Sequence, residues 1–112
     1  MRDAPADAVR HGQLGAILAS MGLKEDAINE GRKAVELVPE SEDAFNGPQT
    51  TAALAEIYAW VGENDEAFRL IDHLLQVPSF MSVEVLKLDP VWDPLRKDPR
   101  FQALIDKYAA KG

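Results

Sequence analysis

The sequence contains no cysteine among its 112 residues. Without thiols the chain can form neither a disulfide framework nor a thiolate metal site, which fits a reducing compartment such as the cytoplasm but leaves the localisation unknown. Long apolar runs are missing as well, because no stretch approaches the roughly 18 residues of a membrane span. Residues 1–7 lack the basic start followed by an apolar run that is typical of a signal peptide. We therefore expect a soluble protein with no membrane insertion.

Basic residues are in the minority. The chain has 12 lysine and arginine residues against 19 aspartate and glutamate residues, which gives a formal net charge of -7. A surface with this balance repels nucleic acid phosphates, so we expect no nucleic acid partner. Hydrophobic residues make up 46% of the chain, which is enough for one continuous core at this length. We predict a single domain over residues 1–112.

Motifs of the common catalytic and cofactor-binding sites are also absent, including the nucleophile elbow, the Walker loop and the glycine-rich dinucleotide fingerprint. His11 and His73 lack metal-ligand partners at helical spacing. We expect His11 to be a packed or partly exposed structural residue and His73 to face solvent. The acidic residues Glu40, Glu42 and Asp43 lack the alternating ligands of a calcium loop, which favours a solvated loop. We predict no enzyme, no cofactor and no metal.

Apolar residues recur at the spacing of an α-helix rather than of a strand, which predicts an all-α fold. Two such stripes are Leu14, Ile17, Leu18 and Met21, and Leu54, Ile57, Tyr58 and Val61. Residues that break or cap helices divide the chain: Gly22, Pro39, Asn46-Gly47-Pro48, Gly62, Asn64 and Pro78. They predict four helices, grouped as one hairpin over about 5–39 and a second over about 47–78.

The two hairpins align with a shift of forty residues, which makes them copies of one repeat. Matched pairs include Leu14 with Leu54, Ile17 with Ile57, Gly22 with Gly62, and Ala27 with Ala67. Antiparallel helices approach to about 8–10 Å only where small side chains lie at the crossing. Residues suited to that place are Gly15, Ala27, Ala34, Ala55 and Ala67. We expect these residues in the contact between the two helices of each hairpin.

In order and spacing, the repeat resembles the signature of the tetratricopeptide repeat. The first hairpin carries Leu14-Gly15, Leu18, Gly22, Ala27, Ala34 and Pro39. The second carries Leu54-Ala55, Tyr58, Gly62 and Ala67, with Leu74 in place of the later alanine and Pro78 one residue early. The resemblance implies a right-handed superhelix of antiparallel helical hairpins with a C-terminal capping helix. It also implies a protein that binds or scaffolds another protein.

Two features depart from the family pattern. Gly31 stands where a large apolar residue usually fills the second helix, so we expect a locally thin core there. The family unit has about 34 residues, whereas the shift here is forty. We place the extra residues in a surface loop around Ser41 to Gly47.

Three Asp-Pro pairs follow the second hairpin, in a capping segment over about 79–112. Aspartate caps a helix start and proline fits the first turn, so each pair resets the helix. We predict a short helix over 82–88, a helical turn near 94–97 and a last helix from Pro99 to about Ala110. The last helix has an apolar stripe of Phe101, Leu104, Ile105 and Tyr108.

Two further expectations concern this segment. We expect Trp92 to be buried against the last helix, and Arg96 and Arg100 to pair locally with Asp93 and Asp98. The segment resembles endings seen after tetratricopeptide repeats in bacterial multidomain proteins. The matching residues are Leu88-Asp89-Pro90, Trp92, Asp93-Pro94-Leu95-Arg96 and Asp98-Pro99-Arg100-Phe101. This resemblance implies that the chain is the C-terminal piece of a longer parent.

The family resemblance also implies that the first helix of each hairpin lines a groove for a protein or peptide partner. The residues on that face are Gly12, Ala16, Ala19, Gln49, Ala52, Glu56, Ala59 and Trp60. Their small, weakly polar side chains suit a partner helix or an extended peptide. The lysine, asparagine and arginine with which some family members hold a carboxylate terminus are missing from the corresponding positions. The alternative is a structural C-terminal cap or self-association unit of a larger protein, which includes a homodimer.

Overall fold

The computed structural model describes residues 4–40, 47–76 and 81–109, which form six α-helices and one 3-10 helix with no strand among them. The elements are α1 (Ala4–Ser20), α2 (Lys24–Leu37), α3 (Gly47–Trp60), α4 (Asn64–Gln76), α5 (Val83–Leu88), η1 (Pro90–Leu95) and α6 (Pro99–Ala109). The predicted all-α fold is therefore confirmed. Within these residues, no helix is both long enough and apolar enough to cross a membrane.

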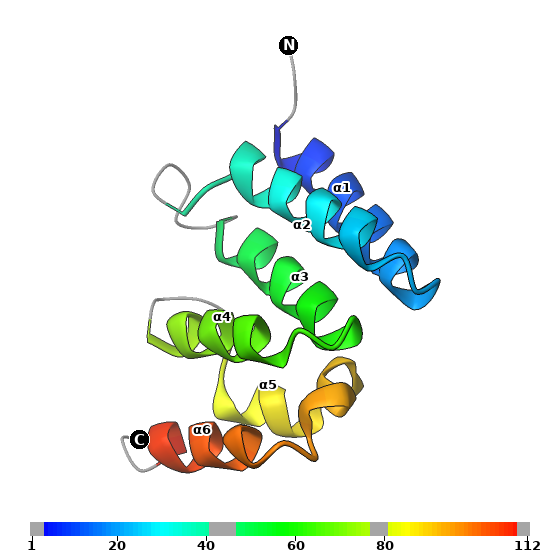
Figure 1. Ribbon diagram of the computed structural model, residues 1–112. Coiled ribbons are helices and arrows are strands. Elements are labelled where there is room, and N and C mark those ends of the chain that lie inside the picture. The colour runs from blue at the N-terminus through cyan, green and yellow to red at the C-terminus, as the bar shows by residue number, and fades with distance from the viewer. Residues whose placement is uncertain (1–3, 41–46, 77–80, 110–112) are drawn as a thin grey trace.

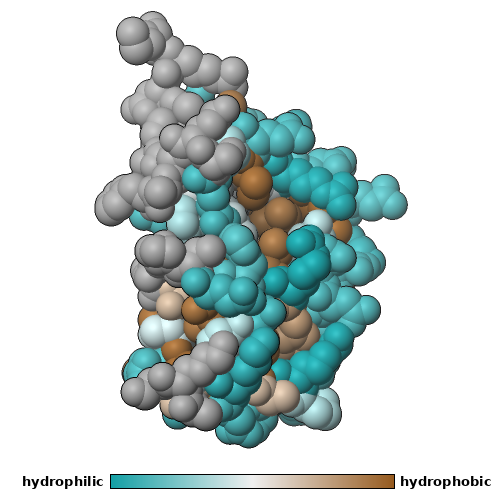
Figure 2. Space-filling model, turned by 90° about the vertical axis from the view of Figure 1, so that its left-hand side faces the viewer, coloured by the Kyte–Doolittle hydropathy of each residue, from teal (hydrophilic) through white to brown (hydrophobic). Residues whose placement is uncertain are grey.

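The helices stack in chain order along the longest dimension of the molecule (Figure 1). The first hairpin (α1 and α2) lies at one end, the second hairpin (α3 and α4) lies in the middle, and α5, η1 and α6 close the other end. The molecule measures 45 × 31 × 20 Å along its principal axes. On the side seen in Figure 2, hydrophobic residues appear as separate patches between hydrophilic ones.

The turns inside the two hairpins have the same construction. Gly22 and Gly62 adopt φ values of +80° and +87°, in the left-handed region that residues with a side chain avoid. In the first turn, the Leu23 amide donates to the Leu18 carbonyl at 3.0 Å; in the second, the Glu63 amide donates to the Tyr58 carbonyl at 2.9 Å. These six-to-one bonds are those of a Schellman motif, which satisfies carbonyls at the helix end. The glycines therefore end α1 and α3 as the sequence predicts, and α4 then begins at Asn64 itself.

Small residues lie at the helix crossings in both hairpins, as the repeat predicts. Ala27, Ala34, Ala55 and Ala67 are fully buried. A Cβ atom added to Gly15 would lie 2.5 Å from Cδ1 of Ile57 and 3.0 Å from the carbonyl oxygen of Ala27. Glycine at position 15 therefore lets α1 approach both α2 and α3.

The expectation of a thin core at Gly31 is wrong. A Cβ atom built on Gly31 would lie 2.8 Å from Cδ1 of Leu54 and 2.9 Å from Cδ1 of Ile57. Side chains from α3 thus occupy the space that a large residue on α2 would otherwise fill. The missing side chain is supplied by the neighbouring hairpin.

The predicted core stripe of α1 is wrong at three of its four positions, and only Leu18 is partly buried against the core. Leu14, Ile17 and Met21 are 42%, 57% and 65% exposed. The buried residues of α1 are instead small, namely Ala8, Gly12, Gly15 and Ala19. Because α1 lies at the end of the stack, it has neighbours on one side only, and that side requires small residues for close approach. In α3 the equivalent stripe is buried as predicted, with Leu54, Ile57 and Tyr58 at most 8% exposed.

A serine and two of the three Asp-Pro pairs start the helices of the capping segment. The prediction that each pair resets the helix is wrong for Asp93-Pro94, because both residues lie inside η1. Ser82 caps α5 by accepting from the Val85 amide at 3.2 Å, and Asp89 caps η1 by accepting from the Val91 amide at 3.0 Å. Asp98 accepts from the Arg100 amide at 3.0 Å at the start of α6. The helical turn lies at Pro90–Leu95 rather than near 94–97, because the first Asp-Pro pair starts it.

The core of the capping segment forms around Trp92, which is 2% exposed and packs in one cluster with Leu95, Phe101 and Ile105. This burial confirms the prediction for Trp92. The guanidinium of Arg96 lies 2.6 Å from a carboxylate oxygen of Asp93, and that of Arg100 lies 2.8 Å from one of Asp98. The predicted local ion pairs are therefore present.

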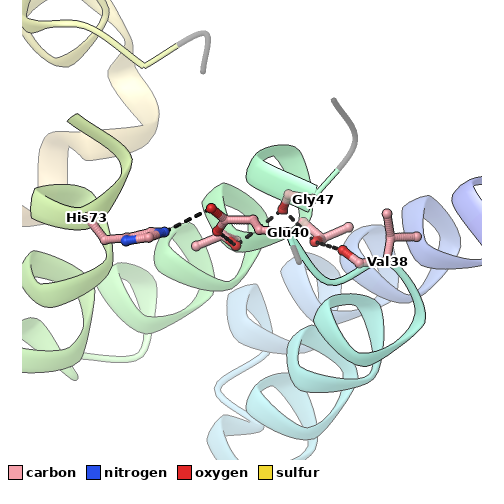
Figure 3. A network of polar contacts seen from close by, with 6 residues as sticks. Val38, Glu40, Gly47 and His73 are labelled. Carbon is pink, nitrogen blue, oxygen red and sulfur yellow. Dashed lines mark hydrogen bonds and ion pairs between the residues drawn. The ribbon is translucent and has the colours of Figure 1, made fainter. Parts of the chain in front are cut away.

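A network of polar contacts joins the start of α3 to the end of the first hairpin and to α4 (Figure 3). The Thr50 hydroxyl donates to the Val38 carbonyl at 3.2 Å and the Thr51 hydroxyl donates to Glu40 at 2.7 Å. Glu40 in turn lies 2.8 Å from Nε2 of His73. A Cβ atom on Gly47 would lie 2.5 Å from the Cα atom of Glu40, so this junction requires glycine. Of the predicted surface loop, residues 41–46 lie outside the described residues.

Candidate functional site

A groove runs between α1 and α3 and is made of two adjoining hollows. The first hollow has a volume of about 300 Å³ and is lined by Val9, Gly12, Gln13, Ala16, Val38, Gln49, Thr50, Ala53 and Glu56. The second has a volume of about 200 Å³ and is lined by Ala16, Ala19, Ser20, Glu56, Ile57, Trp60 and Val91. Ala16 and Glu56 line both hollows and stand where they meet. We call these two hollows together the α1–α3 groove.

The structure brings most of the predicted wall residues together in this groove. Those that line it are Gly12, Ala16, Ala19, Gln49, Glu56 and Trp60. The prediction is wrong for Ala52 and Ala59, which are each 2% exposed and belong to the core cluster shared with the capping segment. They lie on the side of α3 that the capping segment and α4 cover, whereas the groove lies on the side toward α1.

Sequence reasoning missed several apolar residues of the groove. Val9, Ala53, Val38 and Val91 line it but lie outside the face assigned to partner binding. Ala53 follows Gln49 by one helical turn and could have been found from that spacing. Val38 and Val91 come from the end of the first hairpin and from the capping segment, so no local pattern points to them.

Glu56 places a carboxyl group in the middle of the groove. Glu56 is partly buried, and no hydrogen bond or ion pair joins its carboxylate to any other described residue. Burial, with a smaller contribution from the charge of Asp89, raises the pKa of this carboxyl from its ordinary value of 4.5 to about 7. Glu56 is therefore balanced between its neutral and ionised forms near neutral pH.

Trp60 stands at one end of the groove with its ring accessible. The residue is 52% exposed, yet its indole N–H donates to the Val91 carbonyl at 3.0 Å. This bond ties the last residue of α3 to η1 and fixes the ring in place. A held, exposed tryptophan presents a large apolar surface with little conformational entropy to lose on binding.

The dimensions of the groove suit side chains better than a small molecule. Pockets for small molecules and cofactors have volumes of about 300–1,000 Å³, so one hollow is at this lower limit and the other is below it. Gln49 and Trp60 bound the groove along α3, and eleven helical steps of 1.5 Å separate them by about 16 Å. That length matches three turns of a helix or about five residues of an extended peptide.

The histidines and the acidic loop form other polar clusters. His11 is partly buried, with its Nδ1 atom 2.7 Å from a carboxylate oxygen of Glu30, and His73 faces solvent beside Glu40. Both positions match the expectations for these residues. Glu42 and Asp43 lie outside the described residues. Within the described part of the chain, no three histidine, aspartate or glutamate side chains gather as ligands for a metal ion.

Comparisons with protein-family models, with curated proteins and with solved structures find no match to this chain.

Proposed function

We propose that this protein is a tetratricopeptide-like module that binds a segment of another protein in the α1–α3 groove and performs no catalysis of its own. The observation that carries the proposal is the groove itself, with its mostly apolar walls and the fixed, exposed ring of Trp60 at one end. The repeat of two helical hairpins with Schellman turns supports the tetratricopeptide-like architecture.

The walls of the groove favour a polypeptide over other ligands. Backbone or side-chain groups of a bound segment can reach Gln49 and Gln13, which are exposed at its edge. Apolar side chains of the segment can enter the two hollows, which meet at the small side chain of Ala16. Recognition of a helix or extended peptide in an apolar groove uses this combination of side-chain pockets and polar rim groups.

A peptide selection tests the proposal. A random peptide library displayed on phage is selected on the immobilised protein, and affinities of the enriched peptides are measured by fluorescence anisotropy. Ala16→Arg places a long charged side chain where the two hollows meet, and we expect it to weaken binding by about tenfold or more. Ala103→Arg makes the same change on the exposed surface of α6 and should leave binding unchanged. Peptides that bind both variants as well as the parent would exclude the groove.

A second candidate function rests on the outer face of α1. Leu14, Ile17 and Met21 are each between 42% and 65% exposed, whereas the outer positions of α6 include Gln102, Asp106 and Lys107. Exposed apolar faces of this kind mark protein contacts. We infer as the alternative that this face joins the module to a second copy or to another helical unit of a larger protein.

Light scattering distinguishes this alternative. If the α1 face drives self-association, the molar mass rises with concentration, and the double change Ile17→Glu with Met21→Glu returns the protein to a monomer. Gln102→Glu on α6 is the matched control. A monomer at every concentration would exclude self-association through α1 without affecting the proposal for the groove.

A further inference from the structure

Among the residues that the structure describes, Glu56 is the only charged one that lines the α1–α3 groove. The remaining residues along both hollows are apolar, small or neutral and polar. No hydrogen bond or ion pair connects Glu56 to another residue of the described chain. A partly buried carboxylate without a partner is costly, because burial removes water from a charge that nothing else compensates. The described part of the groove therefore lacks a hydrogen-bond donor or positive charge to pair with the carboxylate of Glu56.

The surroundings of Glu56 favour the binding of a positively charged group. None of the α1 residues that line the groove is charged, and Val38 and Val91 contribute apolar surface from the two neighbouring segments. Within the described part of the chain, the charge that acts on the Glu56 carboxyl is that of Asp89, a second negative charge. Trp60 lines the same hollow as Glu56, and the face of an indole ring also attracts cations.

We propose that the α1–α3 groove selects a partner segment by one lysine or arginine side chain, which donates a hydrogen bond to Glu56 while flanking apolar side chains fill the two hollows. The inference rests on the proposed function and names the chemistry of its partner. Charge complementarity favours a basic segment, because a cation compensates the charge of Glu56, which a neutral side chain cannot do and an acidic one would repel. The net charge of -7 on the chain acts in the same direction.

Binding of such a segment must change the protonation of Glu56. The raised pKa means that a fraction of the free protein carries a proton on this carboxyl at pH 7. A cation at hydrogen-bonding distance favours the ionised form and lowers the pKa again. Binding therefore releases a fraction of a proton per complex at neutral pH.

The peptide selection, repeated on Glu56→Gln, tests this inference separately from the proposed function. Glutamine keeps the size of the side chain and removes its charge. We expect peptides enriched on the parent protein to share one lysine or arginine between apolar residues. For these peptides Glu56→Gln should lower the affinity by about 10- to 100-fold, as loss of a charge-assisted hydrogen bond would. Replacing the basic residue of the peptide by glutamine should lower it equally, and the two changes together should cost no more than either alone.

The other outcomes overturn either the inference of a bound cation alone or that inference together with groove binding. Peptides that lose affinity with Ala16→Arg but lack a basic residue, and bind Glu56→Gln as tightly as the parent, would overturn the cation inference and leave groove binding standing. A selection that enriches no peptide at all would overturn both.

Calorimetry provides a second readout that a purely structural role for Glu56 would not produce. The binding enthalpy of an enriched basic peptide is measured at pH 7 in phosphate and in Tris, whose enthalpies of ionisation differ. We expect proton release for the parent protein and none for Glu56→Gln. Equal enthalpies in both buffers for the parent would contradict ionisation of Glu56 on binding and overturn the inference.

Discussion

The two hairpins share one sequence pattern but bury different parts of it. Ile17 in α1 is 57% exposed, whereas Ile57, its equivalent in α3, is 1% exposed. Leu14 and Leu54 differ in the same way, at 42% and 8%. The second hairpin lies between the first hairpin and the capping segment, while α1 lies at the end of the stack (Figure 1). The position of a hairpin in the stack, rather than the residue type, therefore decides which apolar residues of the repeat are buried.

Residues at the contacts within each hairpin behave differently from these stripes. Ala27 and Ala67 are both fully buried, and Gly22 and Gly62 form the same turn. These positions are set by the hairpin itself, so they do not depend on its neighbours. The turn and crossing residues of the repeat are therefore buried or shaped alike in both hairpins, whereas burial of the apolar stripes depends on the neighbouring hairpin.

The largest expected difference between the hairpins is at Ile17 and Ile57. Ile57→Ala removes a buried side chain and should lower the free energy of unfolding by about 2 to 5 kcal/mol. Ile17→Ala removes an exposed side chain and should change it by less than about 0.5 kcal/mol. Urea denaturation followed by circular dichroism measures both values. Equal losses would mean that α1 is covered in solution.

Overpacking of the crossings should affect the two hairpins alike. Ala27→Leu and Ala67→Leu each force a large side chain between helices that touch at an alanine, and each should lower the free energy of unfolding by about 1 to 3 kcal/mol. The same denaturation experiment tests them. If only one of the two variants were destabilised, the hairpins would not share their local construction.

At equivalent positions of the two hairpins, Ala16 has no ionisable group whereas Glu56 has a carboxyl group. The stability of the protein should therefore depend on pH through Glu56. Because the pKa of Glu56 is raised from 4.5 to about 7 in the folded protein, the native state binds more protons than the unfolded state between these values. The contribution of Glu56 to stability is therefore present below pH 4.5 and is lost as the pH rises through about 7. Relative to the parent, Glu56→Gln should gain up to about 2 kcal/mol between pH 4.5 and pH 8, allowing for the partial exposure of the side chain.

Thermal unfolding of both proteins across this pH range provides the measurement. Gln49→Glu, at an exposed position of the same helix, is a control that should show no such pH dependence. A constant difference between the parent and Glu56→Gln at all pH values would contradict the raised pKa.

The smallest effect is expected where the two hairpin turns meet. Lys24 forms an ion pair with Glu63, but both side chains are more than one third exposed. Lys24→Ala should change the free energy of unfolding by only about 0 to 1 kcal/mol. A larger loss would show that contact between the turns contributes to the stacking of the hairpins.

Local patterns in the sequence are sufficient to predict most of the helices. Gly22 and Gly62 require left-handed turns, and Pro99 with its preceding aspartate starts α6 where expected. The exposed side of α1 could not be predicted, because an apolar stripe indicates a buried face without showing whether a neighbour covers it. Gly31 could not be interpreted alone either, since the side chains that fill its space come from α3.

The groove residues show the same limit. Helical spacing is enough to place Gly12 and Ala16 on one face of α1, but that this face meets Glu56 of α3 in a groove is what the family resemblance implies. Ala52 and Ala59 were assigned to the wrong side, because the path of the capping segment over α3 is not encoded in that periodicity. The raised pKa of Glu56 depends on burial by several elements and has no signal in the local sequence.

The wall of the groove that α1 supplies belongs to the hairpin at the end of the stack. Terminal units of such stacks fray first, because they have one neighbour instead of two. Opening of α1 would remove Gly12 and Ala16 from beside Glu56 and abolish the groove while α3 and α4 remain folded. A ligand held against both walls must therefore slow amide hydrogen exchange throughout α1 and α2, far beyond the residues that it touches. If a partner binds in the proposed way, its binding and the local folding of the first hairpin would be coupled in one equilibrium.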